Sequence, residues 1–247
     1  MERETKSDFV FGVHPVLELL RSGKEVEKVF VQAGLRSAEL SEIANHCRAH
    51  GVPVQYVPVE KLNRFTRKAH QGVVAFHCPI EYQALERVIP MVYEQGRDPF
   101  VLMLDRVTDV RNFGAIARTA YAAGVDAIVI PDKGSALING DAMKTSAGAL
   151  SLINVCRVAN MKDAIDFLQA SGLAVVGFTE KAKESLWSAD LRGPLCVVMG
   201  SEEDVISPAY LKRLDRHLMI PMPGDIDSLN VSVATGIVCF EVVRQRQ

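Results

Sequence analysis

Three segments of the 247-residue chain place polar side chains directly after an apolar run, which is where a buried strand would end. In the first, residues 104–118, Asn112 can cap a helix whose first turn contains Gly114. Arg118 follows Asn112 by less than two helical turns and stays near the same helix end. Helix N-termini attract anions, and ligands gather at the carboxyl ends of parallel strands, so this segment can bind an anionic ligand. A capped helix with an exposed arginine explains the segment equally well.

The second segment is Met199-Gly200-Ser201-Glu202, which follows the apolar residues 195–198. Gly200 permits a ligand to approach the backbone closely, and Glu202 places a carboxylate at the edge of the sheet. An ordinary strand followed by an acidic turn is the alternative explanation.

The third segment, residues 218–236, combines a short apolar strand, a loop rich in proline and glycine, and a long helix. Either Ser228 or Asn230 is expected to cap that helix. Ile220 and Met222 beside a polar loop suit a methylthio-adenosine ligand, since apolar walls can hold adenine while backbone groups bind its edges. Taken alone, the segment is better explained by core packing.

These segments depend on strands and helices that alternate along the chain, and this alternation predicts an α/β fold. The C-terminal apolar runs contain no polar alternation, so we expect strands covered on both faces and a largely parallel sheet. The expected strands are Lys28–Val31, Val52–Val57, Val73–His77, Phe100–Leu104, Ala127–Ile130, Leu173–Phe178 and Leu195–Met199. The expected helices are His14–Leu20, Ser37–His50, Phe113–Ala123, Gly140–Ser146, Met161–Ser171 and Val231–Arg244.

Proline and glycine punctuate residues 79–98, which we interpret as a linker between a small α/β domain at 1–78 and a larger domain at 99–247. The formal net charge of −2 argues mildly against a nucleic-acid partner. That average conceals a difference, because residues 1–78 carry 11 Lys and Arg against 9 Asp and Glu, while the rest of the chain is acidic.

The cations of the first domain are concentrated in residues 61–70, which contain Lys61, Arg64, Arg67 and Lys68, one phenylalanine and no acid. Such a cluster suits phosphate contact beside a stacking ring, so Arg64, Arg67 and Lys68 are candidate RNA-binding residues. A solvated basic surface is an equally good explanation.

Other classes of function are disfavoured. The five cysteines form no Cys-x-x-Cys pair and are expected to be buried thiols, and no Cys or His spacing predicts a metal site. The apolar runs are too short to span a bilayer, and the first residues lack the apolar core of a secretory signal. We therefore expect a soluble cytoplasmic protein with no membrane contact.

Together the three segments resemble the three signature motifs of the SpoU (TrmH-like) branch of the SPOUT methyltransferases. They read Asn112-Phe-Gly-Ala-Ile-Ala-Arg118, Met199-Gly-Ser-Glu202, and Ile220-Pro-Met followed by Ser228-Leu-Asn-Val-Ser-Val-Ala-Thr-Gly236. The N-terminal Phe11-Gly-Val-His-Pro-Val-Leu-Glu-Leu-Leu20 and His70-Gln-Gly-Val-Val74 resemble the small RNA-binding domain of the ribosomal members. The resemblance therefore covers nearly the whole chain and is greatest to the 23S rRNA guanosine-2′-O methyltransferases.

The resemblance implies methyl transfer from S-adenosyl-L-methionine (SAM) to a ribose 2′-hydroxyl, most simply of a guanosine in 23S rRNA, without a metal. It also implies a parallel sheet with a C-terminal deep trefoil knot, and a homodimer whose active site forms at the knotted interface. The implied catalytic residues are Asn112, Arg118, Glu202, Ser228 and Asn230. The implied SAM-binding residues are Met199, Gly200, Ser201, Ile220, Met222, Ser228 and Leu229.

Two alternatives remain open. The first keeps the fold and the chemistry but makes tRNA the substrate. The second is a non-catalytic RNA-binding or ribosome-assembly protein on the same fold. Its support is that residues 203–207 contain none of the glycines that many relatives have after the second motif.

Overall fold

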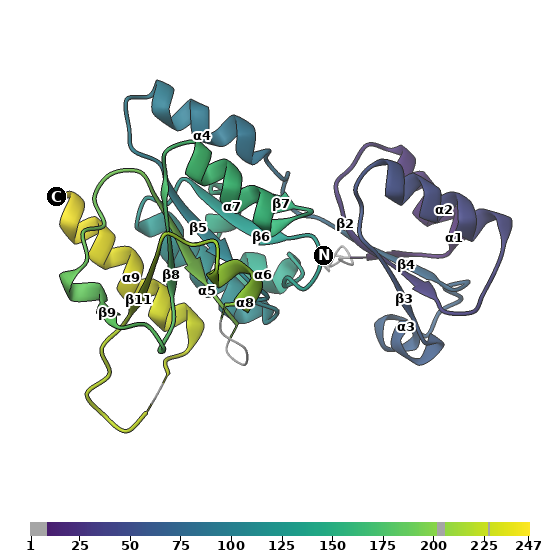
Figure 1. The fold of residues 1–247 in the computed structure, drawn as a ribbon. Helices are drawn as coiled ribbons and strands as arrows, with labels where there is room; N and C mark the ends of the chain where they lie inside the picture. The colour runs from purple at the N-terminus through teal and green to yellow at the C-terminus, as the bar shows by residue number, and fades with distance from the viewer. Residues whose placement is uncertain (1–8, 202–205, 227) are drawn as a thin grey trace, which may run out of the picture. The chain divides into compact units, whose positions relative to one another are not determined.

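The computed structural model describes residues 9–201, 206–226 and 228–247. It divides into two compact units (Figure 1). One comprises the chain up to Glu81 together with Leu137–Gly140, and the other comprises Tyr82–Ala136 and Asp141–Gln247.

The first unit is a mixed sheet in the strand order β1-β4-β2-β3, with β2 and β3 parallel and the other pairs antiparallel. Alternate residues of β4 enter different cores, because successive side chains of a strand point to opposite faces. Val73 and Ala75 pack with α1 and α2, whereas Val74 and Phe76 pack with α3. Its elements are β1 (Phe9–Phe11), α1 (Val13–Arg21), β2 (Val26–Gln32), α2 (Ala38–Ala49), β3 (Val54–Val57), α3 (Val59–Phe65) and β4 (Val73–His77).

The second unit has a sheet in the order β7-β6-β5-β10-β8-β11-β9, and all of its strand pairs are parallel. Every residue of β5, β6 and β10 is buried, which confirms the prediction of a parallel sheet covered on both faces. Its strands are β5 (Phe100–Leu104), β6 (Ala127–Pro131), β7 (Asn154–Val158), β8 (Ala174–Phe178), β9 (Glu184–Ser185), β10 (Leu195–Met199) and β11 (Arg216–Met219). Its helices are α4 (Leu85–Glu94), α5 (Val110–Ala122), α6 (Gly140–Thr145), α7 (Met161–Ala170), α8 (Pro208–Leu211) and α9 (Val231–Arg246).

The segment 79–98, which we expected to be a linker, contains helix α4. Its residues Leu85, Val88, Ile89 and Val92 are buried in one core with α7 and the sheet of the second unit. Apolar residues at intervals of three and four form the inner face of an amphipathic helix. The helix continues through Pro90, so the proline spacing that suggested a linker does not end the element.

Helix α5 begins earlier than expected, because a different residue caps it. The Asp109 carboxylate accepts a hydrogen bond from the Asn112 backbone N–H at 2.7 Å, so Asp109 is the N-cap and Asn112 lies within the first turn. The prediction that Asn112 caps this helix is therefore wrong. This leaves the Asn112 side chain available for a contact outside its own helix.

Candidate functional site

A pocket opens at the carboxyl ends of β8, β10 and β11, beside the first turn of α9. The location agrees with the rule that ligands of open parallel sheets bind beyond the carboxyl ends of the strands. The lining residues are Phe178, Thr179, Glu180, Met199, Gly200, Ser201, Ile220, Met222, Ser228, Leu229, Val231 and Ala234.

The structure brings into this one pocket all seven residues that the sequence pointed to for SAM, namely Met199, Gly200, Ser201, Ile220, Met222, Ser228 and Leu229. Sequence reasoning missed Phe178, Thr179 and Glu180, which follow the buried strand β8. The signal was present, since polar residues after a buried strand are what identified the other segments. Glu180 is important because it places a carboxylate in a pocket whose walls are otherwise mainly apolar.

The Asn230 side chain joins the pocket to helix α5. Its Nδ2 donates to Asn112 Oδ1 at 3.1 Å, across 118 positions of sequence. Its Oδ1 accepts from the Ser232 backbone N–H at 3.0 Å, which makes Asn230 the N-cap of α9 and confirms one of the two expected capping residues. The pocket residues Leu229 and Val231 flank Asn230 in the chain, so this amide fixes the pocket edge against α5.

The other predicted catalytic residues are placed differently. Ser228 lines the pocket, but the Arg118 side chain on α5 is exposed and has no hydrogen bond or ion pair with a described residue. Arg118 lies about 9 Å along the helix axis from Asn112 at 1.5 Å per residue. Glu202 lies outside the described residues.

Gly114 positions α5 by allowing it to lie very close to α6. A Cβ atom added to Gly114 would lie 2.7 Å from the Thr145 Cβ and 2.9 Å from the Ala142 backbone oxygen. Contacts this short leave no room for a side chain. The glycine of the first motif therefore has a packing role in placing the helix that carries Asn112.

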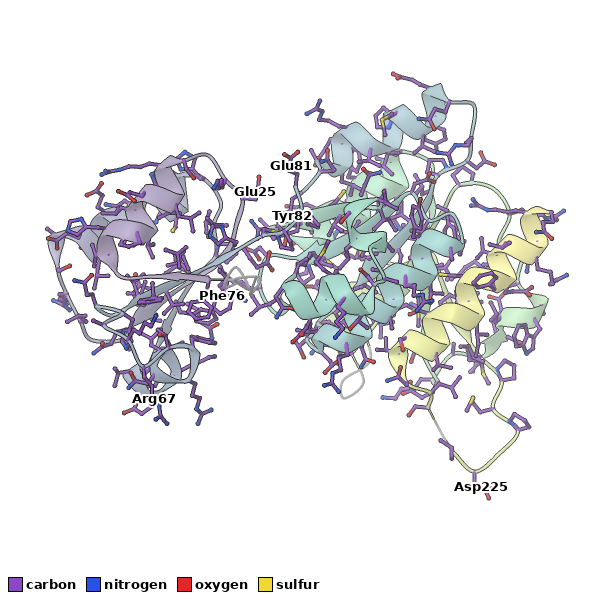
Figure 2. All side chains as sticks on the ribbon, turned by 180° about the vertical axis from the view of Figure 1, so that it is seen from behind. Glu25, Arg67, Phe76, Glu81, Tyr82 and Asp225 are labelled. Atoms are coloured by element: carbon purple, nitrogen blue, oxygen red, sulfur yellow. The ribbon has the colours of Figure 1, made fainter. Side chains whose placement is uncertain are left out.

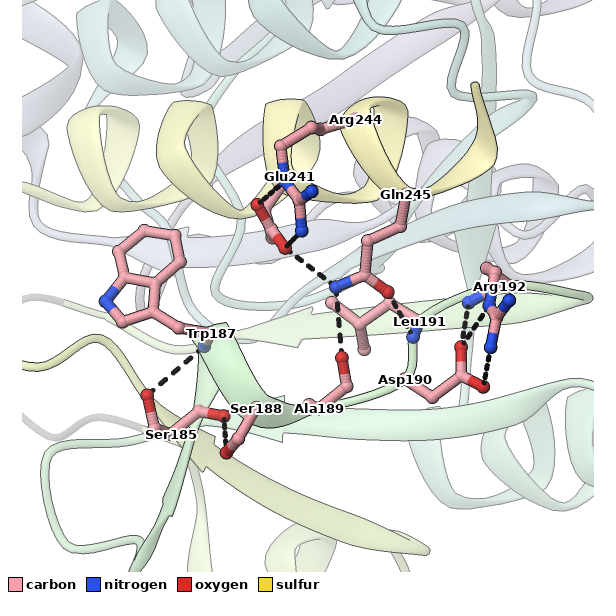
Figure 3. A network of polar contacts seen from close by, with 10 residues as sticks. All are labelled: Ser185, Trp187, Ser188, Ala189, Asp190, Leu191, Arg192, Glu241, Arg244 and Gln245. Atoms are coloured by element: carbon pink, nitrogen blue, oxygen red, sulfur yellow. Dashed lines mark hydrogen bonds and ion pairs between the residues drawn. The ribbon is translucent and has the colours of Figure 1, made fainter.

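The C-terminal half of α9 is held by a polar network (Figure 3). Gln245 accepts from the Leu191 backbone N–H at 2.8 Å and donates to the Ala189 carbonyl at 3.0 Å. Gln245 and Arg244 both donate hydrogen bonds to the Glu241 carboxylate, and the shortest bond from each of them measures 2.7 Å. Hydrogen bonds from Arg244, followed by one from Gln245, lower the pKa of Glu241 to about 2. The helix that caps the pocket is thus anchored at both ends.

The cation-rich segment lies at the end of α3 in the first unit. Arg64 is in the last turn of that helix, Arg67 and Lys68 follow it, and all three are exposed; Figure 2 labels Arg67 at the edge of the unit. The buried His70 holds the segment, because its ring contacts Asn63 Oδ1 at 3.1 Å and accepts from the Gly72 backbone N–H at 3.0 Å. We call Arg64, Arg67 and Lys68 the basic cluster.

The described part of the chain contains neither a membrane-spanning helix nor a cluster of metal-binding side chains. None of its helices combines the length and the apolar content needed to cross a bilayer. Nor do its His, Cys, Asp and Glu side chains gather in threes where they could hold a metal ion. Among the cysteines, burial raises the pKa of Cys156 and of Cys239 to about 12, so both remain thiols at neutral pH.

The fold and the pocket define an α/β protein that binds a partly apolar ligand at the carboxyl edge of a parallel sheet. Residues 99–240 match the SpoU rRNA Methylase family, and the chain belongs to that family. Residues 9–83 match a second family described as RNA 2′-O ribose methyltransferase substrate binding.

Named relatives extend this result over the whole chain. The 23S rRNA (guanosine-2′-O-)-methyltransferase RlmB of Xanthomonas campestris is 38% identical and aligns over 98% of both chains. A protein of Bacillus subtilis named for the TrmH family and for both tRNA and rRNA is 34% identical, over 97% of this chain and 96% of its own. The AdoMet-bound rRNA methyltransferase of Sinorhizobium meliloti superposes with a TM-score of 0.61 at 27% identity, covering 98% of this chain and 88% of that one.

Proposed function

We propose that this protein transfers a methyl group from SAM to the 2′-hydroxyl of a guanosine in 23S rRNA. Family membership supports the reaction, and the RlmB relative, which aligns over 98% of both chains, supports the substrate. The structural observation that carries the proposal is the Asn230–Asn112 hydrogen bond, which joins the pocket to the helix bearing Arg118. A substrate of this kind also favours a cytoplasmic location.

The pocket residues fit SAM by their chemistry. Apolar side chains such as Met199, Ile220 and Leu229 can cover the two faces of adenine, while backbone groups at the strand ends bind its edge. Glu180 supplies a carboxylate, which suits a ligand that carries ribose hydroxyls and positive charge. When bound, SAM supplies a methyl group made electrophilic by a positively charged sulfonium.

The protein must also hold the 2′-hydroxyl of the ribose in line with that methyl group, because proximity and alignment of the reacting groups are a large source of rate acceleration. We assign the orientation of the ribose to Asn112 and Asn230. Arg118 carries a positively charged guanidinium, which is suited to binding an anion. We therefore assign it the target phosphate, where its charge stabilises the negative charge that develops on the 2′-oxygen as the 2′-proton passes to solvent water. Ser228 and Glu202 are assigned to the donor side of the site.

We also propose that the chain forms a homodimer through the exposed side of α5 and α9. Val233 and Phe240 are seven positions apart on α9, so they share one face, and both are about half exposed. Tyr121 adds a third half-exposed apolar side chain on α5, which packs against α9. An apolar stripe of this kind marks an interaction surface.

A deep trefoil knot in the C-terminal segment is part of the same proposal. Its support is the course of the chain after β11, since α9 packs on α5 and is also bonded to Ala189 and Leu191, just before β10. The first unit is proposed to bind RNA through the basic cluster, as the substrate-binding family matched there suggests.

The proposal is tested by incubating the protein with labelled SAM and unmodified 23S rRNA, and mapping the product by primer extension that stops at 2′-O-methyl groups. We expect one methylated guanosine and at least a hundredfold lower rate for Arg118→Ala, the size of effect that loss of a well-placed charge produces. An unchanged rate in Arg118→Ala would remove the role given to that residue.

A tRNA substrate is the second candidate, favoured by the name of the Bacillus subtilis relative. Competition between unmodified tRNA and 23S rRNA in the same reaction separates the two. Label found predominantly in tRNA would replace the proposed substrate while leaving the reaction type intact.

A further inference from the structure

Asp105 is a buried carboxylate at the end of β5, only 1% exposed, and it stands outside the residues assigned above. Its Oδ2 accepts from the Ser207 backbone N–H at 2.7 Å. Its own backbone N–H donates to the Met199 carbonyl at 2.8 Å. The Arg106 guanidinium completes the arrangement with bonds of 3.1 and 3.3 Å to the two carboxylate oxygens.

These bonds place Asp105 between two parts of the chain that flank the second motif. Met199 ends β10 and begins the stretch that lines the pocket, and Ser207 is the N-cap of α8. Ile206, next to Ser207, is 1% exposed and belongs to the core of the second unit. Asp105 therefore bonds to the chain on both sides of Gly200 and Ser201, and Glu202 lies between the same two anchors in sequence.

Arg106 adopts an unusual backbone conformation in making this pair. Its φ is +57°, in the left-handed region that is unfavourable for a residue with a side chain. Strain of this kind persists only where the surroundings impose it. Here the compensating contact is the ion pair between Arg106 and the buried Asp105 carboxylate.

We propose that Asp105 is a positioning residue for the SAM pocket, acting through the Ser207 backbone and the end of β10. The inference rests on the proposed function, because it takes the pocket to be the donor site. Asp105 does not line the pocket. Its backbone N–H bonds to Met199, which does line it, and its carboxylate bonds to Ser207, six positions after Ser201 in the chain. Loss of its charge-assisted bond is expected to loosen the Gly200–Ser201 edge and to weaken donor binding more than RNA binding.

The second unit contains a matched control. Asp126 has a side chain 8% exposed, pairs with Arg97 at 2.8 Å and accepts from the Phe100 backbone N–H at 2.9 Å. It thus repeats the chemistry of Asp105, but beside Phe100, where β5 begins rather than where it ends. Asp105→Asn and Asp126→Asn therefore remove similar interactions, and only the first is next to the pocket.

The experiment measures SAM binding by calorimetry, the KM values for SAM and for RNA, and thermal unfolding for both variants. For Asp105→Asn we expect the Kd and the KM for SAM to rise about tenfold with the KM for RNA unchanged. For Asp126→Asn we expect a similar loss of stability with SAM affinity within about twofold of the starting protein. Equal SAM affinities for Asp105→Asn and the unmodified protein would overturn the inference, as would equal losses in the two variants.

Ser207→Pro provides an independent variant should Asp105→Asn fail to fold. Ser207 has a φ of −51°, which proline can adopt, so the substitution removes the N–H donor and keeps the Asp105–Arg106 pair. The same tenfold weakening of SAM binding is expected, and unchanged binding overturns the inference. If the unmodified protein binds no SAM, the proposed function itself fails, which is a distinct result.

Discussion

Replacing Gly114 by alanine tests the account of how α5 is placed. The added Cβ would lie 2.7 Å from the Thr145 Cβ and 2.9 Å from the Ala142 backbone oxygen, and the second of these is main chain that cannot rotate away. Overpacking of this severity costs about 3 kcal/mol. The gain in helix propensity from glycine to alanine is about 1 kcal/mol, so the expected net loss is about 2 kcal/mol. At about 2 to 4 °C per kcal/mol, the transition of the second unit should fall by about 4 to 8 °C.

Gly236→Ala is the control, since it makes the same change within helix α9. A Cβ there would meet only the Thr119 Cγ2 at 3.6 Å, an ordinary contact. We therefore expect this variant to be as stable as the unmodified protein or up to about 1 kcal/mol more stable. Thermal unfolding of both variants at one protein concentration decides the matter. A Gly114→Ala protein that unfolds at or above the temperature of the unmodified chain would refute the reasoning.

Three further predictions concern the site, the anchor of α9 and the basic cluster. Asn230→Ser should keep the cap of α9 and lose the hydrogen bond to Asn112, so methyl-transfer activity should fall while stability is unchanged. As a control, Asn160→Ala at the N-cap of α7 should lower the free energy of unfolding by about 1 kcal/mol and leave activity unchanged. Glu241→Gln should destabilise the protein at neutral pH, because folding lowers the pKa of Glu241 from 4.5 to about 2. Urea titrations should show that the difference in unfolding free energy between this variant and the unmodified protein disappears as the pH falls from about 4.5 to about 2. Charge reversal of the basic cluster should weaken RNA binding and leave SAM affinity intact in parallel titrations; equal loss of both would indicate a damaged fold.

The elements of the second unit were predictable where hydrophobic patterning was unambiguous. The boundaries expected for Phe100–Leu104 and Leu195–Met199 agree with β5 and β10, because uninterrupted apolar runs can only be buried strands or buried helices, and these are too short for helices. Strand β7 was missed because Asn154 and Arg157 interrupt its apolar residues. Helix α4 was missed because Pro90, with Pro79 before the helix and Pro99 after it, was interpreted as part of a linker.

The residues that line the pocket were easier to predict from the sequence than the hydrogen bonds that join the pocket to other elements. Seven residues predicted to bind SAM line one pocket, five of them at the ends of β10 and β11 and two just before α9. That they bind SAM stays a prediction. The Asn112–Asn230 bond and the Asp105–Ser207 bond join residues more than 100 positions apart, and no local pattern indicates such pairs. Asp109, and not Asn112, is the N-cap of α5, although both residue types can accept a hydrogen bond from a backbone N–H at a helix start. Tertiary packing selects one of them.

Methylation of a 23S rRNA ribose by this chain can be tested by mass spectrometry of ribosomal RNA from cells with and without the protein. We expect one guanosine nucleotide that is heavier by a single methyl group on the ribose, present only when the protein is present. Identical 23S rRNA from both cells, under conditions where the purified protein binds SAM, would contradict it.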